Sequence, residues 1–126
     1  MARTKKQKLC SEADKLWSMV CLEKYGRRCE VCGNQANQVH HFFPKGQYSL
    51  LRYDLDNGIV ICQRCHFKHH QGDPTIHQKI IAKRGIKWYN LLEKRSKKRT
   101  TSYKTTAYYE ENIKRLKNFL KGSMNN

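Results

Sequence analysis

Four of the six cysteines form two pairs with the same spacing. Two residues separate Cys29 from Cys32, and two separate Cys62 from Cys65. Each pair can present two thiolates on one turn, and two such turns complete a tetrahedron around a soft cation. Zinc suits four thiolates, so we expect a structural Zn²⁺ that staples the fold and leaves no position open for catalysis. The alternative is four reduced or disulfide-linked cysteines.

Five of the six histidines lie between positions 40 and 70. His66 and His70 are four residues apart and share one face of a helix. His40 could complete a set of three imidazoles that leaves room for water and phosphate. We therefore predict a catalytic ion bound by His40, His66 and His70. His69 is the alternative to His70 as a ligand, since residues three apart also lie on the same side of a helix. If His69 is not a ligand, we expect both His69 and the isolated His77 to be solvated.

A general base could lie beside this ion. His41 directly follows His40 and could take a proton from water. Asn57 lies at the mouth of the expected hairpin, where its carbonyl oxygen could accept an imidazole N–H and set the tautomer. Neighbours on a regular strand point to opposite faces. His40 and His41 can therefore serve one site only if the strand ends or bulges near Pro44.

Periodicity and turn signals indicate the elements that must position these residues. We expect Ser11 to cap a helix that ends near Gly26 and buries Cys21. The pair Asn57–Gly58 predicts a tight turn before the second strand. The expected strands cover residues 38–43 and 59–61, and the later helices cover residues 63–71, 75–84, 86–95 and 105–121, the last two joined by a basic linker. The last helix should end at Gly122, after an apolar stripe formed by Tyr109, Ile113, Leu116 and Leu120.

These elements predict a small α+β protein. The chain has 126 residues, which allows one modest core that a metal would help to stabilise. We expect residues 1–10 to be a basic disordered arm and residues 11–73 to be the core with its zinc knuckle. Residues 74–126 should form a basic helical extension, packed on the core or tethered to it.

The charge balance favours a polyanionic partner. The net charge is +16, from 26 Lys and Arg against 10 Asp and Glu, which favours nucleic acid over an anionic membrane or an acidic protein. No apolar run could span a bilayer and no secretory signal is evident, so we expect a cytoplasmic protein. The candidate DNA contacts are Lys45, Arg52, Arg64, Lys68, Arg95, Lys97, Lys98 and Arg99.

The order of these residues resembles the HNH, or ββα-metal, endonuclease family. The resemblance covers residues 29–70 and rests on His40–His41, on Asn57 within residues 55–59, and on the run Cys-Gln-Arg-Cys-His at 62–66. Many zinc-knuckle members have Asp where His40 stands, and the double histidine looks more like the colicin-type DNases. The resemblance implies that His41 is the base, that Asn57 orients it, and that Mg²⁺, Mn²⁺, Ni²⁺ or Zn²⁺ serves as the catalytic ion in DNA hydrolysis.

The biological setting is a looser expectation. Small HNH proteins often come from phages or mobile elements. Residues 45–65 also look similar to lambdoid-phage recombination endonucleases of the NinG/Rap type, although those often have Cys-Asn where this chain has Cys65–His66. We expect a monomer or homodimer with low sequence specificity or structure selectivity. The main rival is a non-catalytic zinc-ribbon DNA-binding module, and a third reading is a basic structural protein.

Overall fold

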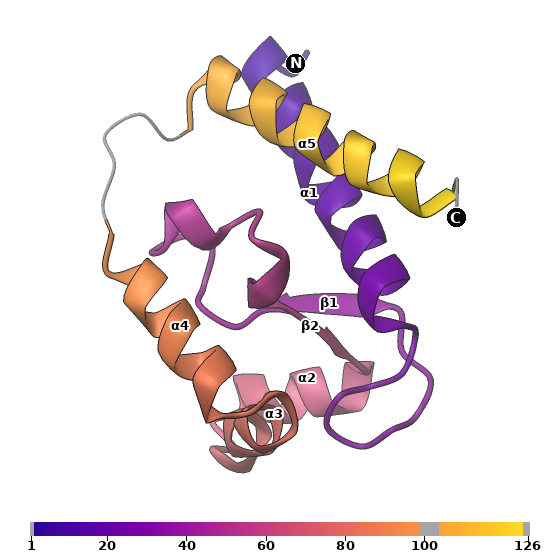
Figure 1. The fold of residues 1–126 in the computed structure, drawn as a ribbon, viewed down its shortest axis with the longest axis vertical. Helices are drawn as coiled ribbons and strands as arrows, with labels where there is room; N and C mark the ends of the chain where they lie inside the picture. The colour runs from indigo at the N-terminus through magenta and orange to yellow at the C-terminus, as the bar shows by residue number, and fades with distance from the viewer. Residues whose placement is uncertain (1, 99–103, 125–126) are drawn as a thin grey trace.

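The computed structural model describes residues 2–98 and 104–124. It confirms the predicted α+β fold, with one two-stranded sheet flanked by helices (Figure 1). The regular elements are α1 (Lys5–Tyr25), β1 (Gln38–His41), β2 (Gly58–Ile61), α2 (Gln63–His70), α3 (Thr75–Arg84), α4 (Ile86–Ser96) and α5 (Thr106–Met124). Two 3-10 turns, Ser49–Leu51 and Leu55–Asn57, lie in the long connection between the strands.

Helix α1 begins earlier than predicted. Thr4, rather than Ser11, caps it: the Thr4 hydroxyl accepts the Gln7 N–H at 3.1 Å, and the Gln7 side chain accepts the Thr4 N–H at 2.9 Å. This capping box satisfies two backbone donors that a helix start otherwise leaves open. Residues 5–10 are therefore helical and do not form an arm. The helix ends at Gly26, as predicted.

The sheet is a short antiparallel hairpin in which His40 is opposite Ile59 and His41 is opposite Gly58. Asn57–Gly58 is not the predicted tight turn, because Asn57 ends a 3-10 turn and Gly58, with φ −93°, opens β2. A glycine is required here for packing. A Cβ on Gly58 would run into the Cys21 Sγ and come within 3.0 Å of Trp17. Glycine thus lets α1 lie directly against β2.

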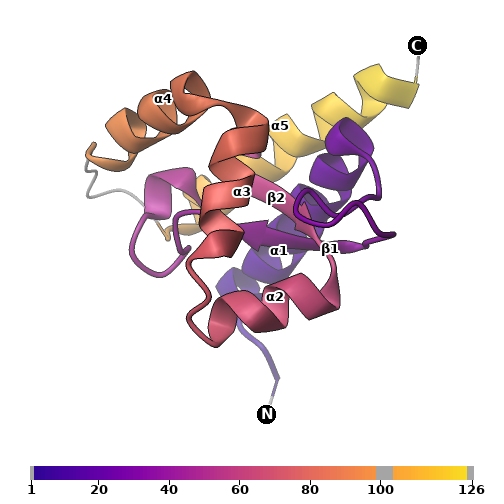
Figure 2. The same cartoon turned by 90° about the horizontal axis from the view of Figure 1, so that it is seen from below.

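Helices cover both sides of the hairpin. In Figures 1 and 2, α1 lies on one side of the strands, while α2 and α3 lie on the other. All four residues of β2 are buried. A strand enclosed in this way is a rigid support for side chains on its partner β1.

Helix α5 packs on α1 and runs in the same direction, as the ion pairs Lys5–Glu110 (3.6 Å) and Glu12–Lys117 (3.3 Å) show (Figure 1). Its predicted apolar stripe is buried at Tyr109, Ile113 and Leu116 and half-buried at Leu120. The helix continues through Gly122 to Met124. Part of the predicted basic linker, residues 99–103, lies outside the described residues.

Candidate functional site

The four paired cysteines come together as predicted. The sulfur atoms of Cys29, Cys32, Cys62 and Cys65 all lie within 4.8 Å of one another, and those of Cys32 and Cys62 are 3.7 Å apart. Cys29 and Cys65 are buried, while Cys32 is exposed. Such a cluster of thiols could hold a structural metal ion.

Local backbone structure positions both cysteine pairs. The Cys29 N–H donates to the Asn34 carbonyl at 2.7 Å, and Gly33 closes the knuckle with φ 81°, a conformation that favours glycine. Cys62 caps α2, its sulfur accepting the Cys65 N–H at 3.4 Å. Although burial raises the pKa of Cys29, backbone N–H groups outweigh this effect and bring the pKa to about 7. Cys29 is thus readily ionised to the thiolate that binds metal, whereas burial raises the pKa of Cys65.

A buried ion pair ties the knuckle to the rest of the domain. Arg84 of α3 donates to both carboxylate oxygens of Glu30, at 2.6 and 2.8 Å. Glu30 also accepts the Val60 N–H at 2.7 Å, and Arg84 donates to the Gly58 carbonyl at 2.7 Å. The two side chains are 5% and 10% exposed. The sequence held no local signal for this pair, because 54 positions separate its members.

His40 faces the histidines of α2 and α3. Its ring centroid lies 4.8 Å from that of His69, 5.1 Å from His66 and 6.0 Å from His77. The set whose ligand nitrogens all lie within 4.8 Å of one another is His40, His69 and His77, not the predicted His40, His66 and His70. The turn after α2 sets this grouping, since it brings α3 back beside α2.

His77 was predicted to be solvated, and the structure contradicts this. Its ring stacks between Phe42 and His69, with centroid distances of 4.3 and 4.4 Å. The Nε2 atoms of His40 and His77 are buried and have no hydrogen-bond partner among the described residues. Burial, reinforced by the neighbouring histidines, lowers the pKa of His40 to about 3 and that of His77 to about 4. Both imidazoles are thus neutral at pH 7, the form that binds a metal ion.

His66 and His70 form a separate pair on α2. Their Nε2 atoms are 3.0 Å apart, and His66 Nδ1 lies 3.3 Å from the side-chain oxygen of Gln38. An amide oxygen can only accept, so Nδ1 of His66 carries the hydrogen and its Nε2 accepts from His70. These two imidazoles therefore have partners, unlike the Nε2 atoms of His40 and His77.

His41 points away from His40, as strand alternation requires. Its ring stacks on Trp17 of α1, with centroids 4.0 Å apart, and its Nε2 lies 2.9 Å from the Arg52 carbonyl. Because a carbonyl only accepts, Nε2 carries the hydrogen and Nδ1 keeps its lone pair. Burial lowers the pKa of His41 to about 4. The tautomer is set by Arg52, not by Asn57 as predicted.

Asn57 is fully buried and holds the connection between the strands. Its side-chain oxygen accepts the Phe43 N–H at 2.8 Å, and its amide group donates to the carbonyls of Phe43 and Leu51 at 3.0 and 3.1 Å. All its hydrogen bonds thus go to backbone. In the structure, Asn57 shapes the connection that supplies the Arg52 carbonyl to His41.

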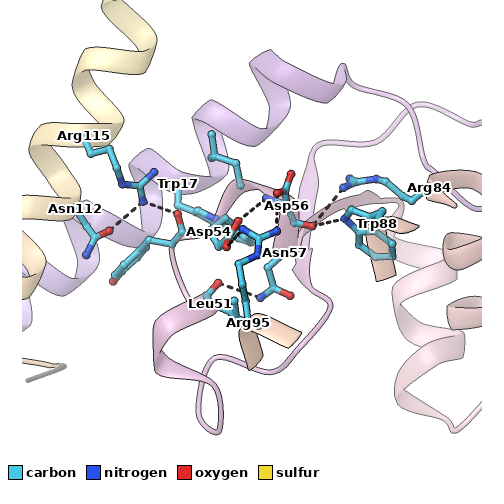
Figure 3. A network of polar contacts seen from close by, with 12 residues as sticks. Trp17, Leu51, Asp54, Asp56, Asn57, Arg84, Trp88, Arg95, Asn112 and Arg115 are labelled. Atoms are coloured by element: carbon cyan, nitrogen blue, oxygen red, sulfur yellow. Dashed lines mark hydrogen bonds and ion pairs between the residues drawn. The ribbon is translucent and has the colours of Figure 1, made fainter. Parts of the chain in front are cut away.

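The same connection is held by helices on several sides (Figure 3). Trp17 of α1 donates to the Asp54 carbonyl at 3.0 Å, and Trp88 of α4 donates to the Asp56 carbonyl at 2.9 Å. Arg95 pairs with both carboxylates, at 2.6 Å for Asp54 and 2.8 Å for Asp56. Arg95 therefore clamps the connection, in contrast to the predicted contact with DNA.

The other predicted DNA contacts divide in two. Arg52 pairs with both carboxylate oxygens of Asp14, at 3.0 and 2.8 Å, and is only 11% exposed, so it is not free to hold a phosphate. Lys97 pairs with Glu93 at 3.3 Å, and Arg99 lies outside the described residues. Five predicted contacts are exposed, Lys97 among them; the others are Lys45, Arg64, Lys68 and Lys98.

Comparison with known proteins gives one match. Residues 29–72 match the family model described as HNH endonuclease. This range includes the four cysteines, both strands and α2, but not His77. No curated protein and no solved structure matches the chain. Among the described helices, none has the length and apolar character to cross a membrane. The similarity to the HNH endonuclease family is thus a domain match over residues 29–72.

Proposed function

We propose that the protein is a metal-dependent endonuclease that hydrolyses phosphodiester bonds in DNA. One observation carries the proposal: the segment that matches the HNH family model contains the four clustered cysteines and two half-buried imidazoles, His40 and His69, whose ligand nitrogens lie within 4.8 Å of each other. The family match favours DNA as substrate. The net charge of +16 agrees with a polyanion.

The thiol and imidazole donors fit two metal sites, one structural and one catalytic. The four thiols suit a structural Zn²⁺, which has no coordination position left for catalysis. His40, with imidazoles presented by α2, would hold the catalytic divalent ion; His66 and His70 remain the ligands that the family resemblance implies. When bound, such an ion supplies Lewis-acid stabilisation to the scissile phosphate and the leaving oxygen.

We assign His41 as the general base that the family resemblance implies. Because its ring stacks on Trp17 and points away from His40, the two histidines can serve one phosphate only if the end of β1 rearranges. Its Nδ1 lone pair would accept a proton from water, and the water oxygen would attack phosphorus as the bond to the 3′ oxygen breaks. The resulting imidazolium would keep its Nε2–H on the Arg52 carbonyl, which supports the positive charge. Asn57 would act as a positioning residue, because it holds the connection that carries Arg52. Base catalysis of this kind is worth ~10²–10⁴ in rate.

DNA would be held mainly through its backbone. Arg64 and Lys68 are exposed on α2, and Lys45 is exposed on the connection that follows β1. Exposed cations of this kind contact phosphates without reading sequence, so we expect low sequence specificity. Origin in a phage or mobile element, action in the host cytoplasm and a monomeric or homodimeric state belong to this proposal. Kinship with the phage recombination endonucleases stays a prediction.

Nicking of supercoiled plasmid tests the proposal. Zinc-loaded protein should nick when Mg²⁺, Mn²⁺ or Ni²⁺ is added, and His41→Ala should reduce the rate ~10²–10⁴-fold while DNA binding is kept. A non-catalytic zinc-ribbon module would bind DNA and nick with none of these ions. Unchanged cutting by His41→Ala would refute His41 as base while leaving the nuclease intact.

A further inference from the structure

We propose that a groove beside the exposed ring of Phe67 binds an unpaired base of DNA next to the phosphate that is cut. The groove has a volume of about 590 Å³ and lies where the start of α2 meets the cysteine knuckle. Its lining residues are Asn34, Gln35, Cys62, Gln63, Arg64 and Phe67. Such binding deepens the proposed function, on which its catalytic meaning rests, because it names single-stranded DNA as a class of substrate.

An aromatic ring without a partner forms one wall of the groove. Phe67 is 61% exposed, and among the described residues no other ring or cation stacks on it. Single exposed apolar side chains are common on proteins, and Leu91 on α4 is equally exposed. Phe67 differs from Leu91 because it offers a π face inside a groove. A nucleobase of any identity can stack on such a face.

Hydrogen-bonding groups surround this ring. Asn34, Gln35 and Gln63 line the same groove and are exposed. Their side-chain amides have no hydrogen-bond partner among the residues that the structure describes. An amide offers donors and an acceptor side by side, which suits the Watson–Crick edge of a base. In a regular duplex that edge is taken up by the opposite strand, so the ring and the amides together select an unpaired base.

Charge complementarity favours DNA as the occupant. Arg64 and no carboxylate lines the groove, and Lys68 is exposed further along α2. Within the part of the chain that is described, neither cation has an ion-pair partner. The acids of the HNH segment, Glu30, Asp54 and Asp56, each pair with an arginine of α3 or α4. A phosphate beside the bound base would therefore meet uncompensated positive charge.

The helix places this groove beside the candidate catalytic site. Gln63, Arg64 and Phe67 are three or four residues apart, so they share one face of α2. His70 follows Phe67 by three residues, a spacing at which Cβ atoms lie ~5–6 Å apart. His70 in turn contacts His66, with the two Nε2 atoms 3.0 Å apart. A nucleotide next to a phosphate held at this imidazole pair can therefore reach the ring.

The knuckle fixes the floor of the groove. Cys62 lines the groove and caps α2, and its sulfur lies 3.7 Å from that of Cys32. The Asn34 carbonyl accepts the Cys29 N–H at 2.7 Å, which ties the opposite wall to the same knuckle. A preformed groove loses little freedom when a ligand binds, which favours affinity.

Fluorescence anisotropy with labelled DNA tests the assignment on the full chain, with zinc in the cysteine site and no catalytic ion, so that nothing is cut. Phe67→Ala should weaken binding of a mixed-sequence single strand ~5–150-fold, the value of one base–aromatic stack, and change binding of the matching duplex less than ~2-fold. Phe67→Trp keeps a π face and should keep the affinity. Leu91→Ala, which truncates an equally exposed side chain, should change neither affinity.

An abasic single strand shows whether the ring binds the base. This strand keeps every phosphate but has no bases, so the wild type and Phe67→Ala should bind it equally well. Arg64→Gln removes a phosphate contact instead. It should weaken binding of both strands and reduce the slope of log affinity against log salt by ~0.7–1. One zinc per chain and an unchanged circular dichroism spectrum control for folding.

Unchanged single-strand affinity in folded Phe67→Ala would overturn the assignment of the groove. An equal loss of affinity for the duplex or for the abasic strand would also overturn it, because the ring would then contact the DNA backbone. Plasmid nicking by the wild type would in each case leave the proposed function standing. Single-strand binding that depends on Phe67, without cleavage of any DNA when a divalent ion is added, would refute only the nuclease.

Discussion

The rings of His41 and Trp17 stack face to face, with centroids 4.0 Å apart and planes inclined by 8°. This contact joins the proposed base on β1 to the buried face of α1, where Trp17 is 1% exposed. The base is thus held by a helix outside the segment that matches the HNH model.

Trp17→Leu should slow DNA cleavage more than Trp17→Phe. Phe keeps a ring against His41, whereas Leu does not, and misplacing a catalytic group by ~1 Å can cost ~10²-fold in rate. Both variants lose the indole hydrogen bond to the Asp54 carbonyl, so this loss does not contribute to the difference between their rates. Plasmid nicking rates at equal folded fraction measure the difference. Equal rates in the two variants would show that the stack does not position His41.

The pH dependence of stability should report the buried state of His41. Burial lowers its pKa from 6.5 to about 4. Between these values the unfolded chain binds a proton that the folded chain does not, so the free energy of unfolding falls as the pH drops through this window. His41→Asn keeps a donor for the Arg52 carbonyl but removes the titration. The free energy of unfolding of this variant should fall less steeply with decreasing pH than that of the wild type. The two slopes should differ by up to ~1.4 kcal/mol per pH unit.

Urea unfolding at a series of pH values measures how steeply the free energy of unfolding falls with pH in each zinc-loaded protein. The series runs from 6.5 down to about 4, the two pKa values of His41. The contributions of His40 and His77 are common to wild type and variant and cancel in the comparison. Parallel slopes would contradict a buried neutral His41.

Loss of the cysteine-bound metal should unfold the HNH domain. Cys65→Ser removes a buried ligand from the cluster, whereas Cys10→Ser alters a cysteine outside it. Because structural zinc supplies folding free energy that a small core lacks, Cys65→Ser should lose zinc and cooperative unfolding. Metal analysis and thermal melts compare the two variants. Retention of one zinc per chain by Cys65→Ser would argue against the four-thiolate site.

The sequence predicted what depends on local spacing and failed where the fold brings distant residues together. The four cysteines and the helix boundaries at Thr75–Arg84 follow from short motifs and glycine signals. The position of His77 depends on how α3 folds back on α2, which no local pattern encodes. Likewise, Arg52 is charged and close to the histidines in sequence, yet its partner Asp14 lies 38 positions away on α1.

Gly58→Ala should destabilise the protein through crowding under α1. The added Cβ would meet the Cys21 Sγ and lie close to Trp17, and overpacking a core typically costs ~1–3 kcal/mol. The backbone at Gly58 is extended, with φ −93°, so alanine adds no conformational strain. Cys21→Ala removes the clashing sulfur and should recover part of the loss. A double-mutant cycle by urea unfolding should give a favourable coupling of ~0.5–3 kcal/mol; simple additivity would exclude this contact as the cause.

Breaking the buried pair of Glu30 and Arg84 should weaken both the fold and the cysteine site. Each partner is at least nine-tenths buried, and removing one leaves an uncompensated charge at a cost of ~3–5 kcal/mol. Because Glu30 lies between Cys29 and Cys32 and binds the β2 backbone, Glu30→Ala should also release zinc more readily to a chelator. Arg84→Met together with Glu30→Leu removes both charges and should recover much of the stability. If the double variant were as unstable as Glu30→Ala, the hydrogen bonds to Val60 and Gly58, rather than charge balance, would dominate this contact.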